Sequence, residues 1–250
     1  MSFGEVVAFL CAGAAAGGIN TIVGSGTLIT FPVLLAFGYP PVTANVTNSI
    51  GLVPGSASGA IGYRRELRGQ RGRVLRLGAM SLLGSLAGAV LLLVLPASAF
   101  KAIVPVFIAV ALVLTLAQPR IGRAIARRNV DVDRHGARLV PAGVLVTGVY
   151  GGYFGAAQGV ILMGFLGALL PQDLQRTNAL KNVLAGIANG VAGLYFAFAA
   201  HVDWGAAALI AAGSIVGAQG GARVGRRLRP DALRWVIVAV GCFAIVRVVT

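Results

Sequence analysis

Lys181 is the residue whose type and position in this sequence most strongly suggest chemistry. It lies in an apolar stretch with Asn178 and Asn182, and Asn189 shares a helical face with Asn182. A charged side chain inside a membrane span is costly and is a candidate for function, although a lysine can also extend its ammonium to the interface. An ammonium beside amides suits a small oxyanion, because these donors replace the hydration that the anion loses.

A second group of polar residues lies in the first third of the chain. Asn45, Thr47 and Asn48 occupy an otherwise apolar segment that continues to Ser56 and Ser58. Serine can bond to its own helix, so Ser56 and Ser58 are interpreted as structural. The asparagine amides need several partners, so we expect them to bridge helices or to line a polar pathway.

Small and polar residues interrupt the two longest apolar runs, at Gly24-Ser25-Gly26 and at Ala157-Gln158-Gly159. Polar backbone is tolerated at membrane depth only where it is buried in protein or lines a water-filled cavity. Helix amino termini beside such breaks offer N–H groups and partial positive charge to an anion. The alternative is a pair of glycines that pack at a helix crossing.

The predicted substrate-binding residues therefore combine backbone N–H, hydroxyl, amide and ammonium groups. They are Asn20, Gly24, Ser25, Gly26, Thr47, Asn48, Gln158, Gly159, Lys181 and Asn182.

Other chemistries find no support in the sequence. The carboxylates lie near segment ends or in basic loops, so neither a proton relay nor a sodium site built from acids is visible. His135 and His201 are isolated in predicted loops, and Cys11 and Cys242 lie inside apolar segments. We therefore predict no enzyme activity, no metal site, no disulfide and no cofactor.

The composition is that of a membrane protein. Hydrophobic residues make up 57% of the 250 residues and charged residues only 11%, against about 25% in a typical soluble domain. Residues 77–100 and 102–118 contain no charge, and about 20 apolar residues are enough to cross a bilayer. The predicted fold class is an all-α, polytopic membrane protein whose partner is the lipid bilayer.

Apolar runs separated by polar breaks mark the expected helices. They lie near residues 3–38, 42–62, 77–95, 101–118, 139–170, 178–200, 205–222 and 235–250. The runs 3–38 and 139–170 are too long for one ordinary span, so each is either one tilted helix or a hairpin of two.

An internal repeat relates the two halves of the chain. A shift of about 133 residues places Gly26 on Gly159 and Ser81 on Ser214. A slip of one residue further places Asn48 on Asn182. The predicted units are a first membrane repeat at 1–118, a basic cytoplasmic linker at 119–138 and a second membrane repeat at 139–250.

Glycines four residues apart, at 84 and 88 and at 213, 217 and 221, predict close helix packing.

The net charge of +14 is concentrated in three short loops, at 64–76, 120–138 and 223–234. Arginine in short loops is retained in the cytoplasm, so we interpret these loops as a topology signal rather than a nucleic-acid site. All three loops lie inside only if each long run is a hairpin that returns to its starting side. Each half then crosses the membrane an odd number of times, which predicts inverted repeats.

The amino terminus has no basic region of the kind that opens a cleavable signal, so we expect it to remain in the protein, with the first helix starting outside. The sequence leaves a homo-oligomer open.

The chain resembles the TauE/SafE family, also called the sulfite exporter or toluene sulfonate uptake permease family, over nearly its whole length. The resemblance is carried by Gly17-Gly18-Ile19-Asn20-Thr21-Ile22-Val23-Gly24-Ser25-Gly26, Phe31-Pro32, Gly38-Tyr39-Pro40-Pro41, Ala44-Asn45-Val46-Thr47-Asn48-Ser49 and Asn178-Ala179-Leu180-Lys181-Asn182.

The resemblance implies a permease of the bacterial inner membrane that moves small sulfur-containing anions such as sulfite or sulfonates. The family often has glycine where this chain has Ser25, and a threonine-serine pair where it has Thr47-Asn48-Ser49. These departures leave the substrate open. A membrane scaffold that does not transport and a passive anion channel remain the alternative functions.

Overall fold

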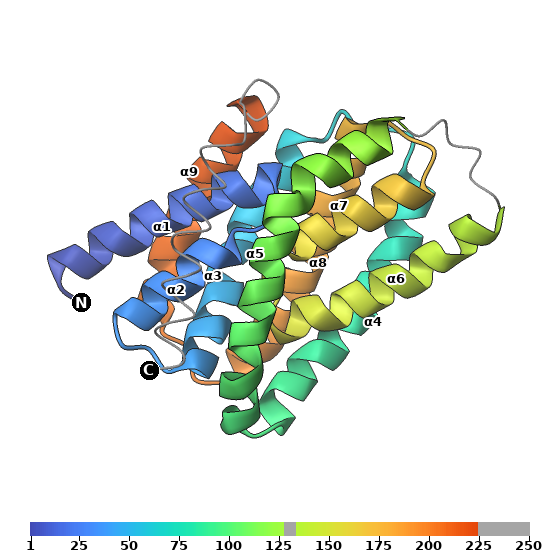
Figure 1. Cartoon of the computed structure of the whole chain (residues 1–250). Helices are drawn as coiled ribbons and strands as arrows, with labels where there is room; N and C mark the ends of the chain where they lie inside the picture. Colours follow the sequence, from blue (N-terminus) through green and yellow to red (C-terminus); the bar gives the residue numbers. More distant parts are fainter. Residues whose placement is uncertain (128–133, 225–250) are drawn as a thin grey trace.

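The computed structural model describes residues 1–127 and 134–224, which form α-helices joined by short connections (Figure 1). The helices are α1 (Phe3–Ile22), α2 (Thr27–Ala36), α3 (Pro41–Gly62), α4 (Arg71–Val94), α5 (Ala97–Arg127), α6 (Arg134–Tyr153), α7 (Gln158–Leu169), α8 (Leu174–Ala199) and α9 (Trp204–Val224). The predicted all-α fold class is confirmed. The predicted run 235–250 and most of the basic loop 223–234 lie outside the described residues.

Each of the two long apolar runs folds as two helices in contact with each other. The first run gives α1 and α2, and the second gives α6 and α7. In Figure 1, α2 turns back beside α1, and α7 turns back beside α6. At 10 and 12 residues, α2 and α7 are about 15 and 18 Å long, about half the thickness of a bilayer core. The single tilted helix is therefore wrong, and the hairpin is right.

The first break lies where the sequence predicts it, but the second lies earlier. The chain leaves α1 after Ile22 and resumes at Thr27, so Gly24-Ser25-Gly26 is the break. In the second hairpin, α6 ends at Tyr153 and α7 already begins at Gln158. Gly155 and Ala157 have φ of +74° and +56°, and this left-handed backbone turns the chain before Gln158. Gln158 and Gly159 are thus the first residues of α7.

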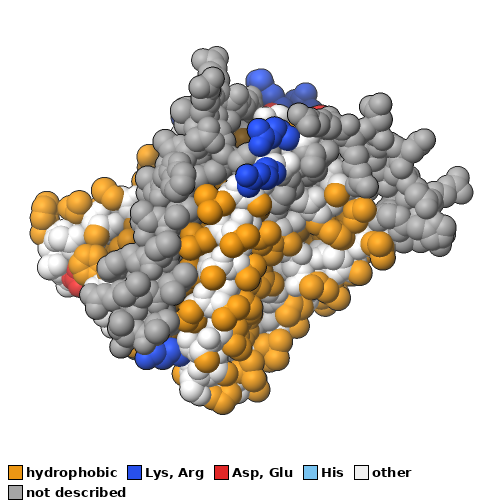
Figure 2. All heavy atoms as spheres, viewed as in Figure 1, with side chains coloured by type: hydrophobic (Ala, Val, Ile, Leu, Met, Phe, Trp, Pro, Cys, Tyr) orange, Lys and Arg blue, Asp and Glu red, His pale blue; other side chains and the backbone are white. Residues whose placement is uncertain are grey.

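Among the described residues, five helices are long and apolar enough to cross a membrane: α1, α4, α5 over Ala97–Ala117, α8, and α9 over Trp204–Arg223. Helix α3 has 22 residues, which is enough length for a crossing, but it is too polar to meet that criterion. Its Asn45, Asn48 and Ser56 are all buried in the protein. These polar side chains have hydrogen-bond partners on the surrounding helices. Apolar side chains cover much of the face in Figure 2.

Several helices begin before the apolar run that predicted them. Asp173 caps α8, because its carboxylate accepts a hydrogen bond from the Arg176 N–H at 2.8 Å. Helix α8 therefore starts at Leu174, and Lys181 lies about two turns inside it. Apolar composition indicates which part of a helix lies in the hydrocarbon core, whereas capping residues determine where the helix begins.

The helices pair in a pattern that repeats between the two halves. Helix α1 packs on α9 and α4 packs on α6, while α3 packs on α9, α4 on α8 and α3 on α8. When α1, α2, α3 and α4 are matched with α6, α7, α8 and α9, the α1–α9 pair maps onto α4–α6 and the α3–α9 pair onto α4–α8. The α3–α8 pair maps onto itself. This pattern agrees with the predicted duplication. The opposite orientation of the two halves and the boundaries 1–118, 119–138 and 139–250 stay predictions.

Glycines make the two closest helix contacts. A methyl group at Gly84 or Gly88 of α4 would collide with the backbone of α6, at Leu145 and Val149. The predicted packing of Gly213, Gly217 and Gly221 is confirmed in the same way, because methyl groups there would collide with the backbone of α1. These contacts hold the first helix of each hairpin against the opposite half.

Candidate functional site

Three donors from α8 converge on the carboxyl end of α1, where the first break begins. The Lys181 Nζ donates to the carbonyl oxygens of Asn20 at 3.0 Å and Thr21 at 3.4 Å. The side-chain amides of Asn178 and Asn182 donate to the Thr21 carbonyl at 3.3 and 3.2 Å. The end of a helix carries partial negative charge and carbonyls without helical partners, so these donors stabilise the break.

Lys181 is buried in the protein rather than extended to the interface. Its side chain is 1% exposed. Its hydrogen bonds go to backbone carbonyls, and within the described ranges 1–127 and 134–224 it has no carboxylate partner. A buried cation without a counter-anion is costly, and neutral carbonyls compensate it only in part. A negative charge beside this ammonium would therefore be stabilising.

An equivalent contact closes the second break from the other half. The Asn45 side-chain amide, on α3, donates to the carbonyl oxygen of Tyr153, the last residue of α6, at 2.9 Å. Asn45 and Asn178 are separated by the same shift of 133 residues that relates the halves. The Oδ1 atoms of both are buried and have no hydrogen-bond partner among the residues that the structure describes. Each half thus caps the broken helix of the other.

The contact between the two breaks joins the first break to the start of α7, immediately after the second break. The Gly159 N–H donates to the Gly24 carbonyl at 3.1 Å. Gly24 has φ of +91°, and a methyl group on either glycine would collide with the backbone of the other. Only glycine permits this approach. The sequence left open whether these residues form an anion site or pack as glycines at a helix crossing. At this contact the glycines pack against each other.

The amino terminus of α2 keeps open backbone donors, whereas that of α7 does not. The N–H groups of Ser25, Gly26 and Thr27 have no acceptor among the described residues. At α7, the Gln158 N–H is bonded to Gly155 and the Gly159 N–H to Gly24. Open donors of the kind predicted for an anion seat therefore lie at α2, and the binding of an anion there stays a prediction. These donors lie beside the lysine site, because Gly26 packs against Asn20.

Of the remaining predicted residues, Ser25 and Asn48 bond close to the first break, whereas Gln158 and Thr47 bond elsewhere. The Ser25 hydroxyl lies 3.1 Å from that of Thr115 on α5, and Asn48 bonds to the hydroxyls of Thr27 and Thr30 on α2. The Gln158 side chain folds back onto α6, where its amide donates to the Thr147 carbonyl at 3.4 Å. Thr47 lies apart, since its hydroxyl accepts the Asp203 N–H at 3.2 Å in the α8–α9 connection.

The structure brings a further polar cluster next to Lys181. The side-chain amides of Asn20 and Asn189 both donate to the Ser56 hydroxyl oxygen at 3.4 Å. Asn20 and Asn189 are partly exposed, whereas Lys181 is enclosed behind the Asn20 carbonyl. Amides exposed to hydrocarbon would be costly, and the bonds to Ser56 satisfy one donor of each amide. The sequence assigned Ser56 a structural role, and the structure places it between two amides.

The profile of the family described as "Sulfite exporter TauE/SafE" matches residues 9–248 of the chain. The chain belongs to the TauE/SafE family. Relatives of this TauE/SafE chain include "Probable membrane transporter protein ORF9" of Sinorhizobium sp, 33% identical over 89% of this chain and 82% of the relative. "Probable membrane transporter protein YfcA" of Escherichia coli K12 is 28% identical over 90% of this chain and 82% of its own length. A "Probable membrane transporter protein" of Haemophilus influenzae is 28% identical, with coverages of 86% and 82%.

No solved structure matches this TauE/SafE chain significantly. Its relatives carry transporter names, and five of its described helices qualify as spans. It is a multi-pass membrane protein of a transporter family.

A polar contact outside the spans of the TauE/SafE chain joins the α2–α3 connection to the α8–α9 connection. The Tyr39 hydroxyl donates to Asp203 Oδ2 at 2.8 Å, and Asp203 Oδ1 accepts the Ala206 N–H at 2.9 Å. The latter hydrogen bond is the main cause that holds the pKa of Asp203 below its usual value. Burial and its bond to Asp203 raise the pKa of Tyr39 to about 12.

Acidification should lower the stability of the folded protein through protonation of Asp203. A lowered carboxyl pKa in the folded state stabilises the fold above the unfolded-state pKa, and this contribution disappears as the pH falls through the folded-state value. We expect the melting temperature to fall below about pH 4 less steeply in Asp203→Asn than in the unaltered protein. Thermal unfolding in detergent at pH 3 to 7 measures both slopes. Equal slopes would show that this carboxylate adds nothing that depends on pH.

Proposed function

We propose that this chain is a permease for a small sulfur-containing oxyanion such as sulfite or a sulfonate. One observation carries the proposal: Lys181 is buried deep in α8 with backbone carbonyls as its described partners and no carboxylate. A substrate anion beside it would supply the missing negative charge. The family description, which names sulfite, supports the choice of substrate class.

The groups around Lys181 suit an oxyanion. The open N–H groups of Ser25, Gly26 and Thr27 are neutral donors, and helix amino termini favour negative charge. The amides of Asn20 and Asn189 and the Ser56 hydroxyl add further donors at the partly exposed side. Lys181 supplies the charge, and the neutral groups replace water around the oxygen atoms.

Transport requires that the site open to one side at a time. We propose that the halves are inverted in the inner membrane, that the basic loops are cytoplasmic, and that the halves move against each other at the contact between the two breaks. The crossed caps support this arrangement, because Asn45 holds the second hairpin and Asn178 the first. Relative movement of the halves would change both caps together.

Flux through the purified protein tests the proposal. Protein reconstituted alone into liposomes should move sulfite or a sulfonate at a rate that saturates with concentration. If no anion of a panel of sulfite, thiosulfate, sulfonates and carboxylates moves or binds, the chain is a scaffold or accessory subunit. A rate that never saturates and follows only the gradient of the anion itself would instead identify a passive channel.

Single cysteines introduced into the basic loops test the orientation. Cys11 and Cys242 are first replaced by serine, and then Arg65→Cys and Arg227→Cys are made separately. Both should react with an impermeant maleimide only from the cytoplasmic side. Labelling of position 227 from the periplasm would overturn the inverted arrangement.

A further inference from the structure

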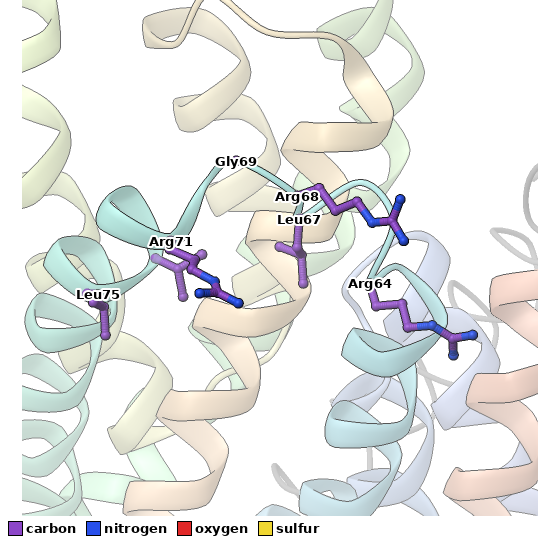
Figure 3. A pocket seen from close by; sticks show the side chains of 7 residues that line it. Arg64, Leu67, Arg68, Gly69, Arg71 and Leu75 are labelled. Atoms are coloured by element: carbon purple, nitrogen blue, oxygen red, sulfur yellow. The ribbon is translucent and has the colours of Figure 1, made fainter.

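The connection between α3 and α4 forms a pocket of about 660 Å³ at one end of the spans (Figure 3). It is lined by Arg64, Leu67, Arg68, Gly69, Arg71, Val74 and Leu75. Figure 3 shows the arginines on both sides of Leu67. The pocket thus combines three cations with three aliphatic side chains, and none of its described lining residues is acidic.

The side chains of the pocket arginines, Arg64, Arg68 and Arg71, have no acceptor among the described residues, whereas those of Arg73 and Arg176 nearby do. Arg73 donates to Gln172 Oε1 at 2.6 Å, and Arg176 donates to the Arg68 carbonyl at 3.0 Å. The second bond fixes the backbone of the connection against α8, so the pocket arginines extend from an anchored backbone.

The apolar part of the pocket lies at the start of a span. Helix α4 qualifies as a membrane span from Arg71 to Val94, so its first turns lie where a bilayer has its phosphate groups. Leu75 is 74% exposed, which suits contact with an acyl chain rather than with water. A soluble phosphate would use the arginines but not this apolar wall.

We propose that this pocket binds an anionic phospholipid. Its phosphate contacts Arg64, Arg68 and Arg71. The part of its acyl chain next to the headgroup lies along Leu67, Val74 and Leu75. Guanidinium groups bind phosphate by paired hydrogen bonds, and basic pockets at the ends of spans recognise anionic headgroups. The lipid site does not depend on the permease proposal, because it lies in a different part of the molecule and needs no transport.

Matched double variants test the site. Arg68→Gln with Arg71→Gln removes two pocket arginines, and Arg65→Gln with Arg76→Gln removes two exposed arginines of the same segment that do not line the pocket. Binding of phosphatidylglycerol and phosphatidylcholine in mixed micelles is measured by native mass spectrometry and by the rise in melting temperature. All four side chains are exposed, and the melting temperature without lipid checks that both variants fold.

We expect the pocket variant to bind phosphatidylglycerol about 10- to 30-fold more weakly than the unaltered protein, and the control to bind nearly normally. Leu75→Gln should also weaken the lipid and should leave binding of free glycerol phosphate unchanged. Equal losses in the two double variants would overturn the site in favour of diffuse charge attraction. Glycerol phosphate binding as tight as phosphatidylglycerol binding, or no preference over phosphatidylcholine, would overturn it as well.

Discussion

Lys181→Met is expected to lower anion flux in proteoliposomes by about 10- to 100-fold, because a charge-assisted hydrogen bond contributes about 1.5–3 kcal/mol. Methionine keeps most of the side-chain length and removes the charge that we propose attracts the substrate. The fold should survive, since the Thr21 carbonyl keeps the amides of Asn178 and Asn182. The measurement is the initial rate of sulfite or sulfonate uptake at equal amounts of inserted protein.

The chain provides a matched control in its other lysine, Lys101, which is exposed at the start of α5. Lys101→Met removes the same charge and should leave the flux unchanged. Equal flux through the unaltered protein and both variants would remove Lys181 from the mechanism. Equal losses in the two variants would mean that overall charge, not the site, controls the rate.

Gly159→Ala should lower the melting temperature by several degrees and should also reduce flux. The new methyl group would collide with Gly24, and the hydrogen bond between the Gly159 N–H and the Gly24 carbonyl would be lost. Overpacking of this kind costs about 1–3 kcal/mol. Because the two breaks meet here, the damage should reach both hairpins.

Gly190→Ala is the matched control, because nothing lies within 4 Å of a methyl group at that position of α8. Alanine favours a helix over glycine by about 1 kcal/mol, so the control should melt at the same temperature or higher. Thermal unfolding in detergent compares the two variants. A Gly159→Ala protein as stable as the control would show that the contact between the breaks is not tight.

Much of the architecture follows from the sequence because it depends on local signals. Run length and charge placement predicted the two hairpins, and Gly24-Ser25-Gly26 marked the first break correctly. The second break was placed about three residues late. Its turn uses Gly155 and Ala157 in left-handed conformations. Gly155 was a signal that could have marked the turn, whereas alanine gives no sign of such backbone.

The partners of polar side chains were harder to predict, because they depend on how distant helices meet. Gln158 was expected to face the substrate, but its amide bonds to α6, on its own hairpin. Thr47 shares α3 with Asn48, yet it faces the α8–α9 connection. The contact between Asn45 and Tyr153 joins the two halves, and the 133-residue shift that places Asn45 on Asn178 was the one signal that could have revealed it.

Equilibrium binding of the anion to the purified protein tests the central claim most directly, because it requires neither a coupling ion nor a known direction of transport. Sulfite, thiosulfate, sulfoacetate and other sulfonates are titrated against the unaltered protein, Lys181→Met and Lys101→Met while thermal unfolding is followed. A ligand at 100 times its Kd stabilises the folded state by about 2.7 kcal/mol. At least one anion should raise the melting temperature of the unaltered protein and of Lys101→Met but not of Lys181→Met. The same rise in Lys181→Met would place the anion elsewhere and would contradict the account.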